Sequence, residues 1–374
     1  MAPSPSRIAL SALKAVELKR LAFLAGLTNS GTKAEHLSRL PKELSVTRIH
    51  NTSNTQSRSK RILSIDMGIR NLAYCVLDVP HPDTRKTATR TPAATFADLT
   101  ASRETMPTAL RGLKLLAWER TAVSAASAVP ATPADGTIAL PNDPVSKESF
   151  EPATLARLAY ALVTSVFLPH DPDVVLIERQ RYRSGSAPSI LEWTVRVNMF
   201  ESMLHGVFET LRQQRDSRAD PSLSNSRAVG RGSSDFPDVH SVNPKKVSSF
   251  WLADRVGMGG EEGKGTAVKK SKEQKEVKIR VAEEWLRGVA LTFSGEAATT
   301  RKAFLEMRAN KKGARRSKKE EIVHDADRNA VKASERDSIK LTKLDDLADC
   351  LLQGIAWVQW EINRRKILEL VDVE

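Results

Sequence analysis

Four acidic residues stand where side chains could do chemistry, and two of them end apolar runs. A short apolar run stops at Asp66, passes through a turn that contains Gly68, and continues as a second apolar run over residues 72–77. This pattern predicts a β-hairpin with the Asp66 carboxylate at the end of its first strand. The apolar run 174–177 stops at Glu178 in the same way, and its unbroken hydrophobicity predicts a strand buried on both faces.

The other acids open a helix near the C-terminus. Apolar residues recur at helical spacing through this segment and predict a helix over residues 343–370. Asp345, Asp346 and Asp349 fall off the apolar stripe, within an arc of about 100°. Acids in a first turn also interact favourably with the helix dipole. Their position alone therefore fits helix capping as well as a functional site.

Carboxylates that converge from distant segments suit the hydrolysis of a phosphodiester with a hard divalent cation. Such a cation activates water and neutralises charge on the phosphate and the leaving oxygen. Mg²⁺ prefers carboxylate oxygens and keeps several of its waters. The chain has two cysteines and seven scattered histidines, so the clustered ligands typical of a zinc site are missing.

The excess of basic residues predicts a polyanionic partner. Lys and Arg number 58 against 45 Asp and Glu, which gives a net charge of +13 and a pI near 9.8. Nucleic acid is the simplest such partner, although a basic composition also serves solubility. The basic run 311–319 is either a solvated surface or a contact to a phosphate backbone. Candidate phosphate-binding residues, with one aromatic that could stack on a base, are Arg70, Arg179, Arg181, Tyr182, Arg183, Lys245 and Lys246.

Composition otherwise indicates a globular protein of a reducing compartment. Hydrophobic residues make up 40% and charged residues 28% of the chain, as is usual for soluble domains. Cys75 and Cys350 lie in apolar segments, and we expect two buried free thiols. No uninterrupted apolar run approaches the ~18 residues of a membrane span, so no membrane partner is expected. The basic N-terminus is compatible with mitochondrial targeting.

The same N-terminal residues also predict a small helical module. Apolar spacing predicts one helix that stops at Gly26, a turn, and a second helix over residues 33–40 that is ended by Pro41. The Gly-Leu and Ser-Gly-Thr-Lys elements resemble a SAP motif, a helix–turn–helix module that binds DNA. This resemblance makes Lys33 a candidate DNA contact.

We expect two structured parts in the chain, a SAP-like module at 11–42 and a main domain at 61–370, with a linker rich in Ser, Thr and Asn at 43–60 between them. Stretches rich in Pro, Ala, Gly, Ser or charge interrupt the main domain. The predicted insertions lie near 80–110, 124–148, 212–236 and 290–340.

The ordered set of acid-bearing segments resembles the RNase H-like nuclease superfamily, and most closely the RuvC-type Holliday-junction resolvases of fungal mitochondria. The segments that carry the resemblance are 64–71 (Ser-Ile-Asp-Met-Gly-Ile-Arg-Asn), 177–184 (Ile-Glu-Arg-Gln-Arg-Tyr-Arg-Ser), 242–244 (Val-Asn-Pro) and 343–349 (Lys-Leu-Asp-Asp-Leu-Ala-Asp). It implies an α/β fold with a central mixed five-stranded sheet flanked by helices. It also implies a homodimer, since a four-way junction is itself two-fold symmetric.

The resemblance further implies an enzyme with a defined set of site residues. It maps Asp66, Glu178, Asp346 and Asp349 onto catalytic metal ligands, with Asp345 as the alternative to Asp346. Two Mg²⁺ ions per site, which Mn²⁺ could replace, would support paired cuts that leave 5′-phosphate and 3′-hydroxyl ends. The implied setting is recombination and segregation of DNA in the mitochondrial matrix.

Two other interpretations stay open. The chain could be a non-catalytic DNA-binding or architectural protein that uses its module and basic surface alone. It could also be an RNase H-like nuclease that acts on another nucleic acid, such as an RNA/DNA hybrid or a transposon end.

Overall fold

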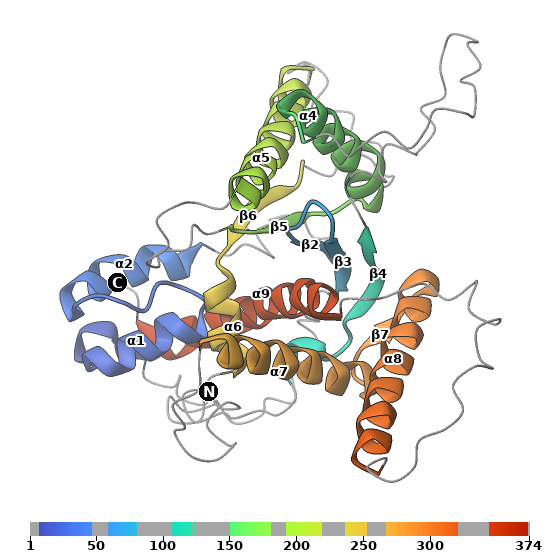
Figure 1. Ribbon diagram of the computed structural model, residues 1–374. Helices are drawn as coiled ribbons and strands as arrows, with labels where there is room; N and C mark the ends of the chain where they lie inside the picture. The colour runs from blue at the N-terminus through green and yellow to red at the C-terminus, as the bar shows by residue number, and fades with distance from the viewer. Residues whose placement is uncertain are drawn as a thin grey trace, which may run out of the picture.

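A mixed β-sheet with helices packed on both of its faces forms the centre of the computed structural model (Figure 1). This architecture agrees with the expected α/β class. The structure describes residues 7–46, 59–80, 107–121, 123, 150–180, 192–218, 236–252, 267–320 and 344–372.

The sheet has six strands in the described part of the chain, where five were expected. The strands are β2 (Lys60–Asp66), β3 (Leu72–Val79), β4 (Lys114–Thr121), β5 (Val174–Glu178), β6 (Asp238–Val242) and β7 (Thr292–Phe293). Their order is β6-β5-β2-β3-β4-β7, with an antiparallel meander of β2, β3 and β4 and parallel pairing elsewhere. The additional strand β7 has two residues. Main-chain hydrogen bonds hold this segment to β4 and to the residue that precedes β4. A strand this short has no apolar alternation by which its sequence could predict it.

Adjacent strands carry the two acids that end apolar runs. β2 and β5 are parallel neighbours, and their register pairs Ile65 with Ile177. The next residues, Asp66 and Glu178, therefore end the strands at the same edge of the sheet. The predicted hairpin of β2 and β3 is confirmed, with Asp66 opposite Ala73.

Helices form one layer on each face of the sheet (Figure 1). Alternation along β3 assigns side chains to the layers, since residues 73, 75 and 77 join the core under α9 (Leu344–Leu370). Residues 72, 74 and 76 join the core under α4 (Pro152–Ala161) and α5 (Glu192–Arg218). Cys75 and Cys350 are buried and free, as expected. The first layer has α6 (Pro244–Leu252), α7 (Ala267–Arg287), α8 (Gly295–Glu320) and α9 (Leu344–Leu370), and the second has α4 (Pro152–Ala161) and α5 (Glu192–Arg218).

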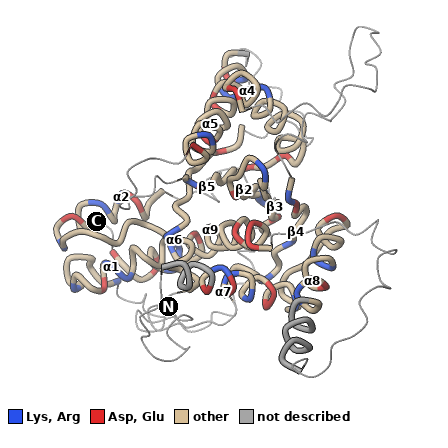
Figure 2. Tube along the Cα trace, in the orientation of Figure 1, with Lys and Arg blue, Asp and Glu red and all other residues tan. Residues whose placement is uncertain are grey.

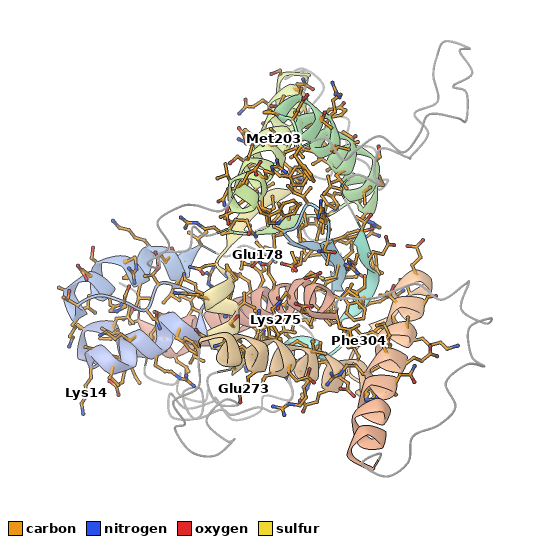
Figure 3. All side chains as sticks on the ribbon, viewed as in Figure 1. Lys14, Glu178, Met203, Glu273, Lys275 and Phe304 are labelled. Atoms are coloured by element: carbon orange, nitrogen blue, oxygen red, sulfur yellow. The ribbon has the colours of Figure 1, made fainter. Side chains whose placement is uncertain are left out.

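The long helix α8 occupies about half of the stretch near 290–340 that was predicted to be an insertion. Its buried residues Ala297, Thr300, Phe304 and Arg308 lie at helical spacing. Phe304 packs on Trp118 of β4, with ring centroids 5.1 Å apart, and Figure 3 shows its position on α8. The apolar positions are few and stand among many charges, which is why the sequence predicted an insertion here and no core helix.

The other predicted insertions fall mostly outside the described residues. Residues 108–110 form a turn of 3₁₀-helix, and residues 212–218, which were predicted to begin an insertion, continue α5 (Glu192–Arg218). The remaining residues of the insertions near 80–110, 124–148 and 212–236 are mostly outside the described part of the chain.

One helical segment is apolar enough to meet the length and composition criteria of a membrane span. It is Pro152–His170, which comprises α4 and the turns that follow it. Its buried residues Leu155, Leu162 and Phe167 belong to the core under α4 and α5. The core helix of a soluble protein meets the same criteria, so this feature is weak support for a membrane.

The N-terminal residues form the two expected helices, α1 (Ala15–Leu24) and α2 (Lys33–Ser45), which pack on the C-terminal end of α9 (Figure 1). A parallel pair of two-residue strands, β1 (Ile8–Ala9) and β8 (Val371–Asp372), adds to this contact. We call residues 8–45 the N-terminal module.

The second helix of the N-terminal module begins at a capping box. The Thr32 hydroxyl accepts from the Glu35 N–H at 3.3 Å, and the Glu35 carboxylate accepts from the Thr32 N–H at 2.8 Å. The helix then continues through Pro41, where it was expected to end. Leu40 and Leu44 are buried on either side of Pro41, and this packing offsets the missing main-chain hydrogen bond.

Main-chain carbonyls at the end of α1 fix the N-terminal module to α9. Asn363 Nδ2 donates to the Leu24 carbonyl at 2.9 Å, and Arg364 Nε donates to the Ala25 carbonyl at 3.0 Å. A buried polar contact of this kind is directional. It gives the N-terminal module a defined position on the main domain.

Candidate active site

The structure brings the strand acids and the helix acids into one partly buried cluster. Asp66 is 9% exposed, and the Met67 N–H donates to Glu178 Oε2 at 3.4 Å. Burial raises the pKa of Asp66 well above its usual range, and the neighbouring charges of Glu178, Asp349 and Asp346 raise it further. These four residues, which we call the acid cluster, are the four carboxylates predicted from the sequence.

Asp349 shares a partly buried ion pair with a lysine of α7. Lys278 Nζ lies 2.9 Å from Oδ1 and 3.1 Å from Oδ2 of Asp349. Burial raises the pKa of Asp349 to about 6, although Lys278 opposes this rise. Burial disfavours the charge on Lys278 as well, but Asp349, Glu178 and Asp66 outweigh it and raise the pKa of this lysine. The charges of three acids therefore stabilise the protonated form of this lysine together.

The two remaining helix acids face different neighbours. Asp345 Oδ2 lies 2.6 Å from Lys275 Nζ of α7, and Asp346 Oδ2 lies 3.6 Å from Arg120 Nε of β4. Asp346 contributes to the raised pKa of Asp66, whereas Asp345 contributes to that of Asp349. Figure 2 shows the acids at the start of α9 beside the basic residues of α7, and Figure 3 shows Glu178 and Lys275 near the centre of the molecule.

The cations around the cluster were missed in the sequence analysis. Lys275 and Lys278 are one helical turn apart on α7, as Asp345 and Asp349 are on α9. This matching periodicity is the only available signal, and it becomes meaningful once the two helices are known to pack together. Arg120 also donates to the side chain of Asn71 in the turn after Asp66, a contact for which the sequence has no pattern.

The donor set of the acid cluster fits a hard divalent cation. Carboxylate oxygens are the ligands that Mg²⁺ prefers, and a cation would relieve the repulsion that raises the pKa of Asp66. As the side chains stand, no group of three or more His, Cys, Asp or Glu in the described residues is arranged to hold a metal ion. The helix acids take Lys or Arg partners instead. The cluster is thus one electrostatic environment and not a closed coordination shell.

The predicted DNA contact Arg70 lies in an aromatic group at the turn after Asp66. Its guanidinium carbon lies 5.2 Å from the ring centroid of Trp193 and 5.8 Å from that of Phe150. Arg196 lies 4.5 Å from the Phe150 centroid. Trp193 is 38% exposed. Cation–π contacts with partly exposed rings suit a surface that binds nucleic acid, and these aromatics were not predicted.

The other predicted basic contacts have varied surroundings. Lys33 Nζ donates to the Ser11 carbonyl at 2.9 Å, and Lys246 Nζ donates to the Gly26 carbonyl at 3.3 Å. The side chain of Lys246 therefore reaches the N-terminal module. Four of the predicted basic contacts are exposed, namely Arg70, Arg179, Lys33 and Lys245. The described residues do not include Arg181, Tyr182 and Arg183.

Comparisons with known proteins agree on one family. A model of the family described as "Mitochondrial resolvase Ydc2 / RNA splicing MRS1" matches residues 62–367. The chain is 26% identical over 290 residues to "Cruciform cutting endonuclease 1, mitochondrial" of Schizosaccharomyces pombe, with 77% of this chain and 82% of the relative covered. It is 23% identical over 366 residues to the Saccharomyces cerevisiae protein of the same name, with 96% and 85% covered.

A solved structure is also similar, the crystal structure of the yeast mitochondrial Holliday junction resolvase Ydc2. The TM-score is 0.48 at 21% identity, with 94% of this chain and 95% of that chain covered.

Proposed function

The chain belongs to the family of mitochondrial resolvase Ydc2 and RNA splicing MRS1, and from this premise we propose that it is a mitochondrial endonuclease that cuts four-way DNA junctions. The two relatives named above are cruciform cutting endonucleases of mitochondria. The family description also includes a splicing protein. Family membership alone therefore does not distinguish cutting DNA from binding RNA, and the residues of the site must distinguish them.

The acid cluster is the observation that favours a nuclease over a protein that only binds RNA. Burying Asp66 beside Glu178, Asp349 and Asp346 raises its pKa and therefore costs stability. A protein that only binds RNA gains nothing from this repulsion, and its phosphate-binding surface would be weakened by buried negative charge. A nuclease needs such a cluster, since hard cations are its means of activating water and neutralising the phosphate.

Each residue of the acid cluster has a role in this proposal. Asp66, Glu178, Asp349 and Asp346 would hold the cations, with Mg²⁺ as the resident ion and Mn²⁺ as a substitute. Asp346 is preferred over Asp345 because it acts on Asp66 directly, while Asp345 is paired to the most exposed of the surrounding cations. When bound, the cations supply a nucleophilic water and stabilise charge on the leaving oxygen.

Basic residues beside the cluster would position the DNA. The Arg70 group with Trp193 would hold the strand next to the scissile phosphate, and Arg179 would contact a neighbouring phosphate. Arg181, Tyr182, Arg183, Lys245 and Lys33 stay predictions of the same kind. We also propose an RNase H-like fold with a SAP-like N-terminal module, and a homodimer that matches the two-fold symmetry of a junction.

A panel of labelled nucleic acids tests the function. The protein with Mg²⁺ should cut a synthetic four-way junction into nicked duplexes that a ligase can reseal, because the products carry 5′-phosphate and 3′-hydroxyl ends. Linear duplex and an RNA/DNA hybrid should be cut at least about tenfold more slowly. Tight junction binding without cutting would favour the architectural alternative. Preferred binding of structured RNA without cutting would favour the splicing role.

A further inference from the structure

A buried glutamine connects the segments that carry the acids. Gln353 lies on α9 about one turn beyond Asp349 and is 3% exposed. Its Nε2 donates to the Ser64 hydroxyl at 3.1 Å, to the Ile65 carbonyl at 3.1 Å and to the Leu176 carbonyl at 3.4 Å. One side-chain amide thus bridges α9, β2 and β5.

These acceptors stand next to the acid cluster. Ile65 immediately precedes Asp66, and Leu176 lies two residues before Glu178 on the adjacent strand. The Ser64 hydroxyl in turn donates to the carbonyl of Cys350 at 2.8 Å, one residue beyond Asp349. The hydrogen bonds therefore link the backbone beside each of three carboxylates.

A glycine next to Gln353 brings the helix against the sheet. A Cβ atom at Gly354 would lie 2.6 Å from Leu77 Cδ1 and 3.2 Å from Ser64 Cβ. These distances leave little room for any side chain at this position. Close approach at Gly354 sets the height of α9 above the sheet, and the Gln353 amide fixes its register along the strands.

We propose that Gln353 is a positioning residue that fixes Asp349 relative to Asp66 and Glu178 and so sets the affinity of the acid cluster for divalent cations. This inference depends on the proposed function. Three ligands from three elements hold a cation well only when their spacing is held by surrounding hydrogen bonds. An apolar residue of the same length could fill the space, but it would remove this side-chain donor from the Ser64 hydroxyl and from the two carbonyls, and the register of α9 would be free to shift.

The test compares Gln353→Met with a matched glutamine on the same helix. Gln359 is also buried, accepts from the Ala109 N–H at 3.0 Å and donates to Asn363 Oδ1 at 3.0 Å. Gln359→Met removes as many polar atoms from α9 but lies farther from the acids. Mn²⁺ binding is measured by electron paramagnetic resonance on the DNA-free protein, together with the thermal unfolding midpoint.

We expect Gln353→Met to raise the Mn²⁺ dissociation constant by about tenfold or more, as for groups that orient metal ligands. Gln359→Met should change it by less than about twofold, although both variants lower the unfolding midpoint. Excess Mn²⁺ should restore junction cleavage in Gln353→Met.

Two results would overturn the inference. One is a lower unfolding midpoint in Gln353→Met with unchanged Mn²⁺ affinity, which would make the role structural only. The other is an equal loss of affinity in Gln359→Met, which would indicate general loosening of α9. If Gln353→Met fails to fold, Ser64→Ala probes the same bridge from β2, and unchanged Mn²⁺ affinity there overturns it as well.

The wild-type protein separates this inference from the proposed function. If wild type binds Mn²⁺ and cuts junctions, and Gln353→Met binds Mn²⁺ equally well, the positioning role is wrong but the nuclease function stands. Wild type that neither binds Mn²⁺ nor cuts any junction overturns both.

Discussion

The two ends of α9 are both rich in charge but use it in opposite ways. At the N-terminal end, Asp349 is half-buried beside Asp66 and Glu178, and the charges of these acids repel one another. At the C-terminal end, Glu361 and Arg364 are each 3% exposed at the side chain and form an ion pair of 2.8 Å. We call these the acid end and the docking end.

The difference lies in whether the charges are already satisfied. At the docking end, Arg364 also donates to a carbonyl of the N-terminal module, so removing either member of the ion pair takes a charged partner from a buried group. At the acid end the carboxylates hold like charge in excess, and lysines from another helix offset it in part. A network that is already satisfied holds structure together. Excess like charge that a cation could relieve is the signature of a site.

The largest expected effect is the loss of cleavage when the acid end loses a ligand. Asp66→Asn and Asp349→Asn should each slow junction cleavage by at least about 100-fold, because a ligand contributes more than the groups that orient it. Junction binding should persist, and the unfolding midpoint without cation should not fall, since a repulsion is removed. Cleavage gels and binding titrations measure this.

The control for this effect is Asp216→Asn on α5, where the acid pairs on the surface with Arg212 and should not affect cleavage. Wild-type rates in either of the acid-end variants would show that the acid cluster is not the site.

The docking end should respond in stability instead. Arg364→Met removes the cation that pairs with the buried Glu361 carboxylate, and the free energy of unfolding should fall by about 3–5 kcal/mol. Urea unfolding measures this, and the double variant with Glu361→Gln should recover part of it. At a temperature where Arg364→Met is folded, its cleavage rate should stay within a few-fold of wild type. A loss as large as that of Asp349→Asn would make the two ends equivalent and contradict the comparison.

The sequence predicted the acid end better than the docking end. Asp66, Glu178 and Asp349 could be found because each ends or opens an apolar pattern, and such patterns predict strands and helices locally. The docking end depends on contacts between residues such as Asn363 and Leu24 that are far apart in the chain. The Gly26 pattern predicted the end of α1 correctly, but no local rule indicates which surface then packs on it.

The lysines of α7 show the same limit inside the site. Lys275 and Lys278 look like ordinary charges of an amphipathic helix, and only the packing of α7 beside α9 gives them acid partners. Helix α8 was missed for a related reason, since its buried stripe includes Thr300 and Arg308, two residues that usually face solvent.

A smaller effect should follow from a single methyl group at the docking end. Gly26 has a φ of +67°, and a Cβ there would lie 2.3 Å from Trp360 of α9. Gly26→Ala should cost about 2–3 kcal/mol through the left-handed backbone and the overlap together. Differential scanning calorimetry measures it. Gly206→Ala on α5, which has open space around it, should instead stabilise by about 0.5–1 kcal/mol. Equal stability of Gly26→Ala and wild type would mean that the N-terminal module is not held at this point.

The smallest effect is a pH dependence of opposite sign at the acid end and in the N-terminal module that packs on the docking end. Burial lowers the pKa of His36 in the N-terminal module from 6.5, so the folded state resists protonation. Its contribution to stability is present above pH 6.5 and is lost as the pH falls below that value. The pKa of Asp349 is raised from 3.8 to about 6, so the penalty of its charge is present above pH 6 and is relieved as the pH falls.

The two variants His36→Leu and Asp349→Asn separate these contributions. The unfolding midpoint is measured without cation at pH 7.5 and at pH 5.5. On going from pH 7.5 to pH 5.5, the midpoint of His36→Leu should fall less, or rise more, than that of wild type. The midpoint of Asp349→Asn should fall more, or rise less, and both differences should be a few degrees at most. The sign of each difference is the informative result, because the loss of a contact that does not titrate would shift a variant's midpoint equally at pH 7.5 and at pH 5.5. Identical pH responses in all three proteins would mean that neither His36 nor Asp349 titrates in the environment that the structure gives it.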